Sequence, residues 1–206
     1  MYLDVFSENP YGTNCWLLAS EGSTDAVVVD PGFEPARVRA LLDAAGKRPA
    51  AVLLTHAHVD HAGAAGDFAG DDVPVYIHDA DALAFSDADA WNPGFGNALA
   101  PAKDLRSIGD GDVLELGGLA VEVQHTPGHT PGHCVFVTDA LVLSGDLVFA
   151  GSIGRSDFPN SDPAAMRESL RRFLRLPDEL PVHPGHGPTT SVARERASNP
   201  FLAELR

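Results

Sequence analysis

Nine histidines occur in the 206 residues, and three of them, His56, His58 and His61, fall within six residues together with Asp60. Neutral imidazole and carboxylate oxygen are both ligands of zinc, at about 2.0–2.2 Å. One histidine in a turn is more often a structural residue with a satisfied hydrogen bond, but four such groups after one apolar segment favour a metal site. The i, i+2 spacing can direct His56 and His58 to one side, while Asp60 and His61 face a second position. This segment could therefore serve two adjacent metal ions.

Side chains of the same kinds recur beside glycine or proline along the chain. They lie in residues 125–133, in 144–146 and in 183–187. Pro-Gly steps fix tight turns, which would hold ligand side chains in place before a metal arrives. Each segment alone is weak evidence, but together they repeat one pattern of strand, turn and ligand. Because metal coordination lowers the pKa of water from about 15.7 toward 7, the residues predict metal-assisted hydrolysis of a carbonyl or phosphoryl ester.

The elements that must position these residues are short apolar segments alternating with helices. The segments are nearly continuous runs, which suits strands buried on both faces. Strands are expected at residues 3–6, 14–19, 26–30, 51–55, 73–77, 120–124, 133–138 and 140–144. Helices are expected at 34–45 and 163–174, the second with Asp162 as N-cap and Pro163 at its first position. The alternation predicts a layered α/β fold, in which sites gather at strand ends.

Charge, the start of the sequence and the cysteine content limit the partners and the compartment that we expect. The chain has 14 Lys plus Arg against 29 Asp plus Glu, a net charge of −15, which argues against nucleic acid and against an anionic membrane as partners. The sequence opens without a basic and apolar leader, and no apolar run approaches 18 residues, so we expect a cytoplasmic protein that spans no membrane. Cys15 and Cys134 are expected to be reduced and buried, with a single disulfide as the alternative.

The order of the motifs carries a resemblance to a known family. His-x-His-x-Asp-His is followed by Thr-Pro-Gly-His-Thr-x-Gly-His, then Ser-Gly-Asp, then Pro-Gly-His-Gly. This order resembles the metallo-β-lactamase superfamily and, within it, the short glyoxalase II-like hydrolases; residues 151–159 and 195–202 also look like that subgroup. The resemblance implies one α/β domain over residues 1–206, an αββα sandwich of two mixed sheets flanked by helices, with metals at the sheet edge.

The resemblance also implies a role for each ligand-type residue. Seven metal ligands follow from it: His56, His58 and His129 in a first site, Asp60, His61 and His186 in a second, and Asp146 as the bridging carboxylate. Asp60 and Asp146 are the candidate catalytic residues, and the alternative for Asp60 is to orient a base without binding metal. Two divalent ions are expected, zinc first, with iron or manganese as alternatives because His and Asp also suit them.

The remaining histidines and Asp30 need other roles. His133 and His125 look like residues that orient ligands through a ring N–H. Asp30 resembles the family's supporting aspartate, and its alternative is a turn residue before proline and glycine. His78 is expected to be a surface or capping residue, and His183 a structural one.

Similarity to glyoxalase II implies the substrate, a thioester of a 2-hydroxy acid with a thiol carrier, of the S-lactoylglutathione type. Hydroxide would attack the carbonyl, metal would stabilise the oxyanion, and a thiol of pKa near 8.5 leaves without a strong acid. Arg155 is the candidate for binding the carboxylate of the carrier, with an Arg155–Asp157 ion pair as the alternative.

One departure concerns the carrier. Longer glyoxalase II enzymes have a C-terminal helical domain that contributes to thiol binding, whereas 20 residues follow His186 here, and residues 194–205 predict one short helix. Carrier recognition is therefore expected from the loops at 86–105 and 151–162, or from a partner subunit, and the carrier could be a thiol other than glutathione.

Other functions share this scaffold. A persulfide dioxygenase uses one iron held by two His and one Asp, and its last histidine usually lies in Pro-Ala-His-Asp-Tyr; the sequence Pro184-Gly185-His186-Gly187-Pro188 favours hydrolysis. A lactonase or another esterase would use the same metal core. A nuclease is disfavoured by the charge, and a β-lactamase by the expected compartment. A structural metal-binding protein with a dead site is disfavoured because Asp60 and Asp146 are both present.

Overall fold

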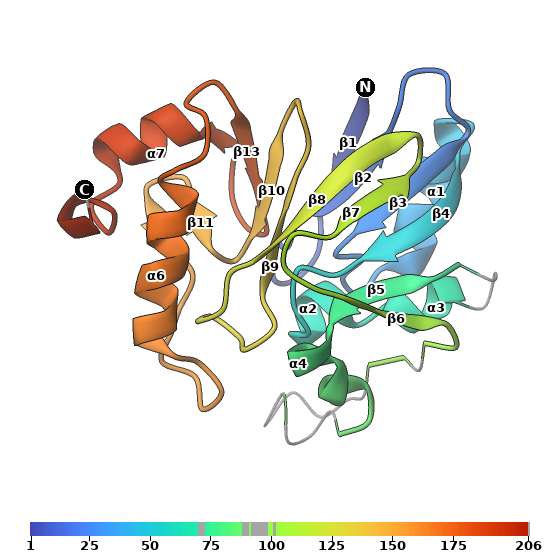
Figure 1. The fold of residues 1–206 in the computed structure, drawn as a ribbon. Coiled ribbons are helices and arrows are strands. Elements are labelled where there is room, and N and C mark those ends of the chain that lie inside the picture. Colours follow the sequence, from blue (N-terminus) through green and yellow to red (C-terminus); the bar gives the residue numbers. More distant parts are fainter. Residues whose placement is uncertain (70–72, 88–90, 92–98, 101, 206) are drawn as a thin grey trace.

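The computed structural model describes residues 1–69, 73–87, 91, 99–100 and 102–205, and within them two mixed sheets lie face to face (Figure 1). In the first sheet β1 and β2 pair antiparallel, as do β2 and β3, and the following pairs are parallel. Its strands, in spatial order, are β1 (Tyr2–Phe6), β2 (Cys15–Ala19), β3 (Asp25–Val29), β4 (Arg48–Leu53), β5 (Val75–His78) and β6 (Leu105–Ile108).

The second sheet is antiparallel except for one parallel pair, β10 with β13. Its strands, in spatial order, are β14 (Thr190–Ser191), β13 (Pro181–Pro184), β10 (Val142–Gly145), β9 (Cys134–Val137), β8 (Leu119–His125) and β7 (Val113–Leu116). A short hairpin of β11 (Val148–Phe149) and β12 (Ser152–Ile153) follows β10.

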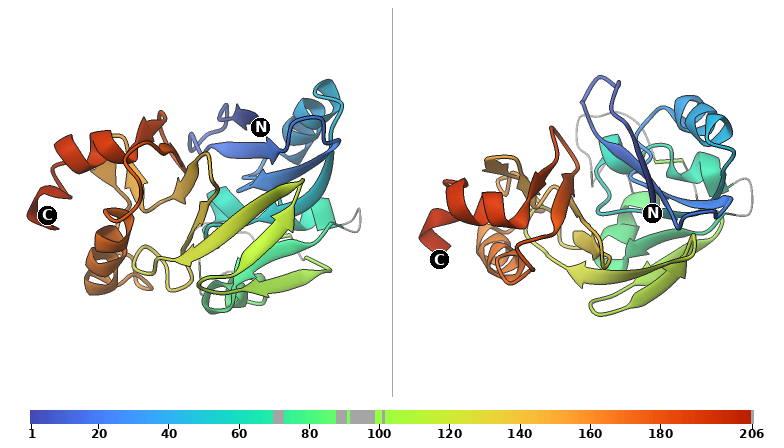
Figure 2. Two further views of the ribbon diagram at one scale, coloured as in Figure 1. Left: turned by 45° about the horizontal axis from the view of Figure 1, so that its top comes forward. Right: turned by 90° about the horizontal axis from the view of Figure 1, so that it is seen from above.

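Helices cover the outer face of each sheet, as Figure 2 shows from two further directions. Beside the first sheet lie α1 (Pro35–Ala44), α2 (Val59–Ala62), α3 (Ala65–Ala69), α4 (Asp79–Ala82) and the 3₁₀ turn η1 (Leu83–Phe85). Beside the second sheet lie α6 (Pro163–Phe173), α7 (Val192–Ser198) and the 3₁₀ turn η2 (Ala203–Leu205). The expected αββα sandwich is confirmed.

Among the described residues, three apolar cores explain why the strand sequences are continuously hydrophobic. Along β2, Leu17 packs into the core shared with α1 and α3, while its neighbour Leu18 packs into the core between the sheets. Along β3, Val28 and Val27 divide in the same way. Because successive side chains point to opposite faces, a strand covered on both sides needs an apolar residue at every position. The third core lies between the second sheet and α6.

Both cysteines are buried and free, as expected. Cys15 belongs to the core between the first sheet and its helices, and Cys134 to the core between the sheets. Burial raises the pKa of each thiol, so both remain protonated small hydrophobic residues at neutral pH.

The start of α6 and the end of the chain show how local sequence sets helix limits. Oδ1 of Asp162 accepts from the backbone N–H groups of Ala164 and Ala165, at 2.8 and 3.1 Å, which confirms the predicted N-cap. The one short helix expected within 194–205 is present as the end of α7, which stops at Ser198 and is followed by the 3₁₀ turn η2. Asn199 adopts an extended ψ of 119°, as a residue before proline favours.

Among the described residues, no helix has the length and apolar character needed to cross a membrane.

Candidate metal centre

The predicted ligands lie on loops at one edge of the sandwich, where the ends of several strands meet. The loop after β4 carries His56 and His58, the loop between β8 and β9 carries His129, and Asp146 and His186 follow β10 and β13. Backbone hydrogen bonds join the two sheets here. The N–H of Cys134 donates to the carbonyl of Thr55 at 2.7 Å, and that of Asn14 donates to Gly185 at 2.7 Å. The cluster is therefore built on the ends of buried strands rather than on a free loop.

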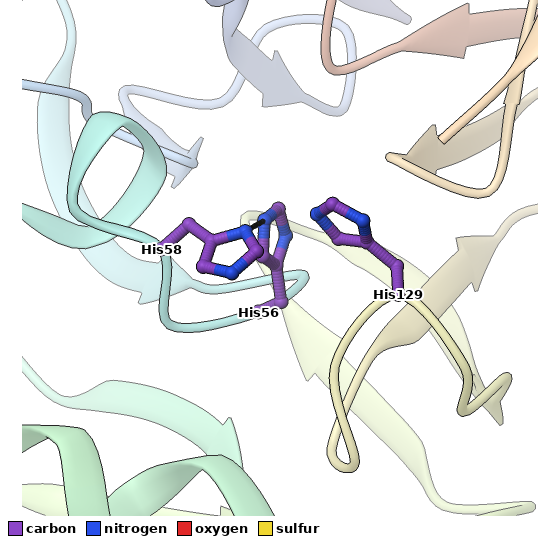
Figure 3. Close-up of side chains that lie close together, drawn as sticks. All are labelled: His56, His58 and His129. Atoms are coloured by element: carbon purple, nitrogen blue, oxygen red, sulfur yellow. Dashed lines mark hydrogen bonds between the residues drawn. The ribbon is translucent and has the colours of Figure 1, made fainter. Parts of the chain in front are cut away.

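His56, His58 and His129 form a first group, whose ligand nitrogens all lie within 4.8 Å of one another. Nε2 of His56 is 3.0 Å from Nδ1 of His58. Figure 3 shows His56 and His58 side by side on one loop, with the ring of His129 facing them from another. Three imidazoles at this spacing make a nitrogen-rich site of the kind that zinc and iron accept.

Asp60, His61 and His186 form a second group, again with ligand atoms within 4.8 Å of one another. Nε2 of His61 lies 3.2 Å from Nε2 of His186, and Oδ2 of Asp60 lies 3.3 Å from the same His186 atom. The hydroxyl of Thr13 donates to Oδ2 of Asp60 at 2.9 Å. This group differs from the first because it contains a carboxylate.

Asp146 lies between the two groups. Its Oδ2 is 3.4 Å from Nε2 of His129, and its Oδ1 is 3.4 Å from Nε2 of His61. A glycine at position 185 is needed for this approach, because a Cβ there would lie 2.4 Å from Oδ1 of Asp146. The structure therefore places the expected bridging carboxylate within reach of both groups.

Two buried atoms of the cluster test whether a metal fits. Nε2 of His129 and Oδ1 of Asp146 have no hydrogen-bond partner among the described residues. An unsatisfied buried polar atom costs about 1–3 kcal/mol, so each of these two atoms, one on either side of the cluster, calls for a partner. Both have lone pairs directed into the cluster, and a divalent cation would satisfy both. The residues present therefore fit one or two metal ions.

The electrostatics of the second group favour a cation. Burial alone would lower the pKa of His61, but the carboxylates of Asp60, Asp146 and Asp30 raise it to about 10. Burial would likewise raise the pKa of Asp60, yet His61 and His186 hold it well below its usual range. Positive charge is thus stabilised at the point where the carboxylates converge, and a bound metal ion would replace the proton on His61.

The first group has the opposite character. Burial, with smaller contributions from neighbouring imidazoles, lowers the pKa of His58 to about 3 and the pKa of His56 well below its usual value. Burial also lowers the pKa of His129. All three rings are therefore neutral at pH 7, which is the form that binds a metal.

Asp30 and His133 support the cluster from behind. Nδ1 of His61 lies 3.0 Å from Oδ2 of Asp30, which also accepts from the hydroxyl of Thr55 at 2.7 Å. His133 acts on the backbone instead of on a ligand ring, because its Nε2 accepts from the N–H of Asp146 at 3.0 Å. Asp30 thus contacts a ring of the second group, and His133 holds the turn that carries Asp146.

Arg155 affects the site through two different groups. Its carbonyl accepts from Nδ1 of His129 at 2.7 Å, which leaves Nε2 of that ring free for a metal. Its side chain is 65% exposed, and its guanidinium pairs with Asp157 at 2.8 Å and lies 4.4 Å from the centre of the Phe158 ring. The ring of Phe158 in turn contacts His58, with centres 5.3 Å apart. The alternative expectation, an Arg155–Asp157 ion pair, is therefore present, and the guanidinium lies along the wall of the cluster.

The other histidines lie apart from the cluster. The expectation that His125 orients a ligand was wrong, because its ring stacks on His78 at 4.0 Å and its Nε2 bonds to the carbonyl of Pro131. His78 caps α4 by accepting from the N–H of Ala80, as expected. His183 is buried and packs edge-on against Trp16, in agreement with a structural role.

Two buried acidic residues support the site and were not predicted. Both oxygens of Glu195 accept hydrogen bonds: Oε1 from the hydroxyl of Thr190, and Oε2 from the N–H of Gly151 and from Nδ2 of Asn199. Glu195 thereby fixes the start of the segment that leads to Arg155. Asp81 is fully buried in α4, and burial raises its pKa to about 6. Neither belongs to a ligand motif, although Glu195 and Asn199 lie in the segment 195–202 that resembles the family.

The loop expected at residues 86–105 is only partly described. Residues 88–90, 92–98 and 101 lie outside the described residues, so its expected part in recognising the carrier stays a prediction. The second loop expected to do so, residues 151–162, is described throughout and contains Arg155 and Phe158.

Comparisons with known proteins agree with this geometry. The family model described as "Metallo-beta-lactamase superfamily" matches residues 9–192. "Probable metallo-hydrolase YqgX" of Bacillus subtilis is 36% identical, over 94% of this chain and 93% of its own. "Hydroxyacylglutathione hydrolase GloC" of Haemophilus influenzae is 32% identical, over 98% of each chain. The solved structure of TTHA1623 "in a di-iron-bound form" is 42% identical with a TM-score of 0.85, over 98% of this chain and all of its own.

Proposed function

The chain is a metallo-hydrolase that belongs to the metallo-β-lactamase superfamily, and we propose that it hydrolyses thioesters of the S-lactoylglutathione type. The observation that carries this proposal is the pair of unsatisfied buried atoms, Nε2 of His129 and Oδ1 of Asp146, within a cluster of two groups of metal-ligand side chains. The substrate class is supported by the relative whose name is hydroxyacylglutathione hydrolase.

We propose seven side chains as ligands of two divalent ions. His56, His58 and His129 would hold the first ion, Asp60, His61 and His186 the second, and Asp146 would contact both. Bound there, the ions would lower the pKa of water toward 7 and stabilise negative charge on a carbonyl oxygen. Zinc is the proposed metal and iron or manganese the alternatives, since these ligands suit all three and a solved relative is di-iron-bound.

The chain's own residues would orient the substrate. The guanidinium of Arg155 lies over Phe158, whose ring contacts His58, so a carboxylate bound by Arg155 would place the rest of a thiol carrier along this wall. The guanidinium is paired with Asp157 in this structure, but an exposed ion pair of this kind is worth at most about 1 kcal/mol. A substrate carboxylate can therefore displace Asp157. The thiol product leaves as thiolate, so no protein acid is required.

The proposal is tested by offering three substrates to one metal-loaded preparation. S-lactoylglutathione, its oxygen-ester analogue and glutathione persulfide are compared, with thiol release, acid release and oxygen uptake as the readouts. We expect thiol release from the thioester well above acid release from the ester, and no oxygen uptake. Oxygen uptake with the persulfide, in the absence of thioester hydrolysis, would identify the alternative persulfide dioxygenase and overturn the proposal.

A further inference from the structure

Asp81 joins the two loops that carry the first group of imidazoles. Its Oδ2 accepts from the backbone N–H of Ala57 at 3.0 Å and from the hydroxyl of Thr130 at 2.7 Å. Its Oδ1 accepts from the backbone N–H of Gly132 at 2.5 Å. Ala57 separates His56 from His58, and Thr130 directly follows His129. One carboxylate therefore holds both sides of the site from behind.

The surroundings of Asp81 are built for this contact. The carboxylate is fully buried, a costly position for an ionisable group unless hydrogen bonds stabilise it. Position 132 must be glycine, because a Cβ there would lie 2.6 Å from Oδ1 of Asp81. Helix α4, which begins with the cap made by His78, fixes the backbone of Asp81 directly after β5. The contact is thus rigid on the Asp81 side and specific on the loop side.

We propose that Asp81 is a positioning residue for the first metal ion, which sets the spacing between His129 on one loop and His56 and His58 on the other. This inference rests on the metal centre proposed above. The hydrogen bonds of Asp81 go to two backbone amides and one hydroxyl and to no ligand ring, so it acts through the backbone and the hydroxyl that it binds.

Asparagine at position 81 cannot accept hydrogen bonds from the backbone N–H groups of both loops. Its amide has one oxygen and one NH₂ group, and the NH₂ must occupy the place of either Oδ1 or Oδ2. In the first case it faces the N–H of Gly132, and in the second the N–H of Ala57. One backbone donor loses its acceptor in either orientation, although the size of the side chain is unchanged. Asp81→Asn therefore releases one loop without opening a cavity.

The test is a Zn²⁺ titration of metal-free chains in competition with a chromophoric chelator. We expect wild type to bind two ions, and Asp81→Asn to bind one of them about 10- to 100-fold more weakly, the range typical of residues that orient metal ligands. The control is Asp79→Asn, the same change at an exposed position of the same helix, which should leave both affinities unchanged. In a His58→Ala background, which weakens the first ion, Asp81→Asn should have no further effect on the second.

The outcomes separate a positioning role from a structural one. A merely structural residue would lower the melting temperature of the metal-free chain and leave both Zn²⁺ affinities unchanged, and that result would overturn the inference. If Asp81→Asn does not fold, Thr130→Val removes one donor to Oδ2 and keeps both backbone contacts; it should weaken the same ion to a smaller degree, and unchanged affinities would overturn the inference. A wild-type chain that binds no Zn²⁺ would refute the proposed metal centre itself.

Discussion

Oδ2 of Asp30 lies 3.0 Å from Nδ1 of His61, so a buried carboxylate fixes this ring, whose Nε2 faces His186 within the second ligand group. Asp30 occupies a left-handed backbone position with φ of 52°, which few residues other than glycine, Asn and Asp adopt. The same carboxylate binds both the N–H and the hydroxyl of Thr55. The connection between β3 and β4 therefore determines which nitrogen of His61 can bind a metal.

Asp30→Asn should disable His61 as a ligand while keeping the backbone. The N–H of Thr55 donates to Oδ1 of Asp30 at 2.8 Å, so the amide oxygen would take that place and its NH₂ would face His61. Nδ1 would then have to accept, which moves the ring proton to Nε2, the atom needed by a metal. We expect Zn²⁺ affinity at one of two sites to fall about 10- to 100-fold by titration. Exposed Asp139→Asn is the control, and equal affinities in the two variants would contradict the assignment.

Two substitutions of Glu195, to Gln and to Met, should differ in their effect on the free energy of unfolding. In Glu195→Gln the NH₂ can face the hydroxyl of Thr190, which can accept as well as donate, while the amide oxygen keeps Gly151 and Asn199. Glu195→Met removes the acceptor from all three donors, and for the fully buried amide of Asn199 this costs about 1–3 kcal/mol. Urea denaturation should place Gln within about 0.5 kcal/mol of wild type and Met lower by about 2 kcal/mol. Equal losses in both variants would show that Glu195 does not hold this segment.

Asp81 predicts a pH dependence of stability. Burial raises its folded pKa from 3.8 to about 6, so the folded chain binds more protons here than the unfolded chain between those values. Stability from this group is therefore present at low pH and is lost as the pH rises from about 4 to 6, by about 3 kcal/mol. The difference in free energy of unfolding between metal-free wild type and Asp81→Asn should fall by this amount as the pH rises from about 4 to 6. A difference that is constant with pH, or that grows, would contradict the raised pKa.

Arg155→Met separates the side chain from the backbone of this residue. Methionine keeps an apolar stem over Phe158 and leaves the carbonyl that accepts from His129. We expect KM for S-lactoylglutathione to rise about fivefold, since an exposed ion pair is worth at most about 1 kcal/mol, with kcat unchanged. A thioester of an uncharged thiol serves as the control and should show the same KM in both enzymes. A fall in kcat with constant KM would exclude Arg155 as the carboxylate-binding residue.

The fold was predictable where the sequence pattern is determined by burial. Apolar residues fill both faces of β2 and β3 because a core lies on each side of the first sheet. The strand β13 was missed because Pro181 and Pro184 form its ends, and proline within a run argues against a strand. It forms nevertheless, since Val182 between them is fully buried and pairs with β10. The strand β7 was missed because its residues are exposed or half-buried.

The site was predictable to the extent that its residues lie in short motifs. The structure brings His56, His58, His61, His129 and His186 together with both predicted aspartates. Asp81 could not be predicted, because its partners lie 24 to 51 positions away and two of the three are backbone amides. No feature of the sequence distinguishes it from Asp79. The placement of His125 was missed for the same reason, since its stacking on His78 depends on how the sheets pack.

The central claim is that the cluster holds metal ions that make thioester hydrolysis possible, and one titration tests it most directly. Metal is returned to the chelated chain, and bound metal and the rate of S-lactoylglutathione hydrolysis are measured on the same samples, for wild type and for Asp146→Ala. We predict that the rate rises with bound metal up to about two ions per chain, and that folded Asp146→Ala loses most of the activity. A chelated chain that keeps the full rate, or a variant that matches wild type at equal metal content, would contradict the account.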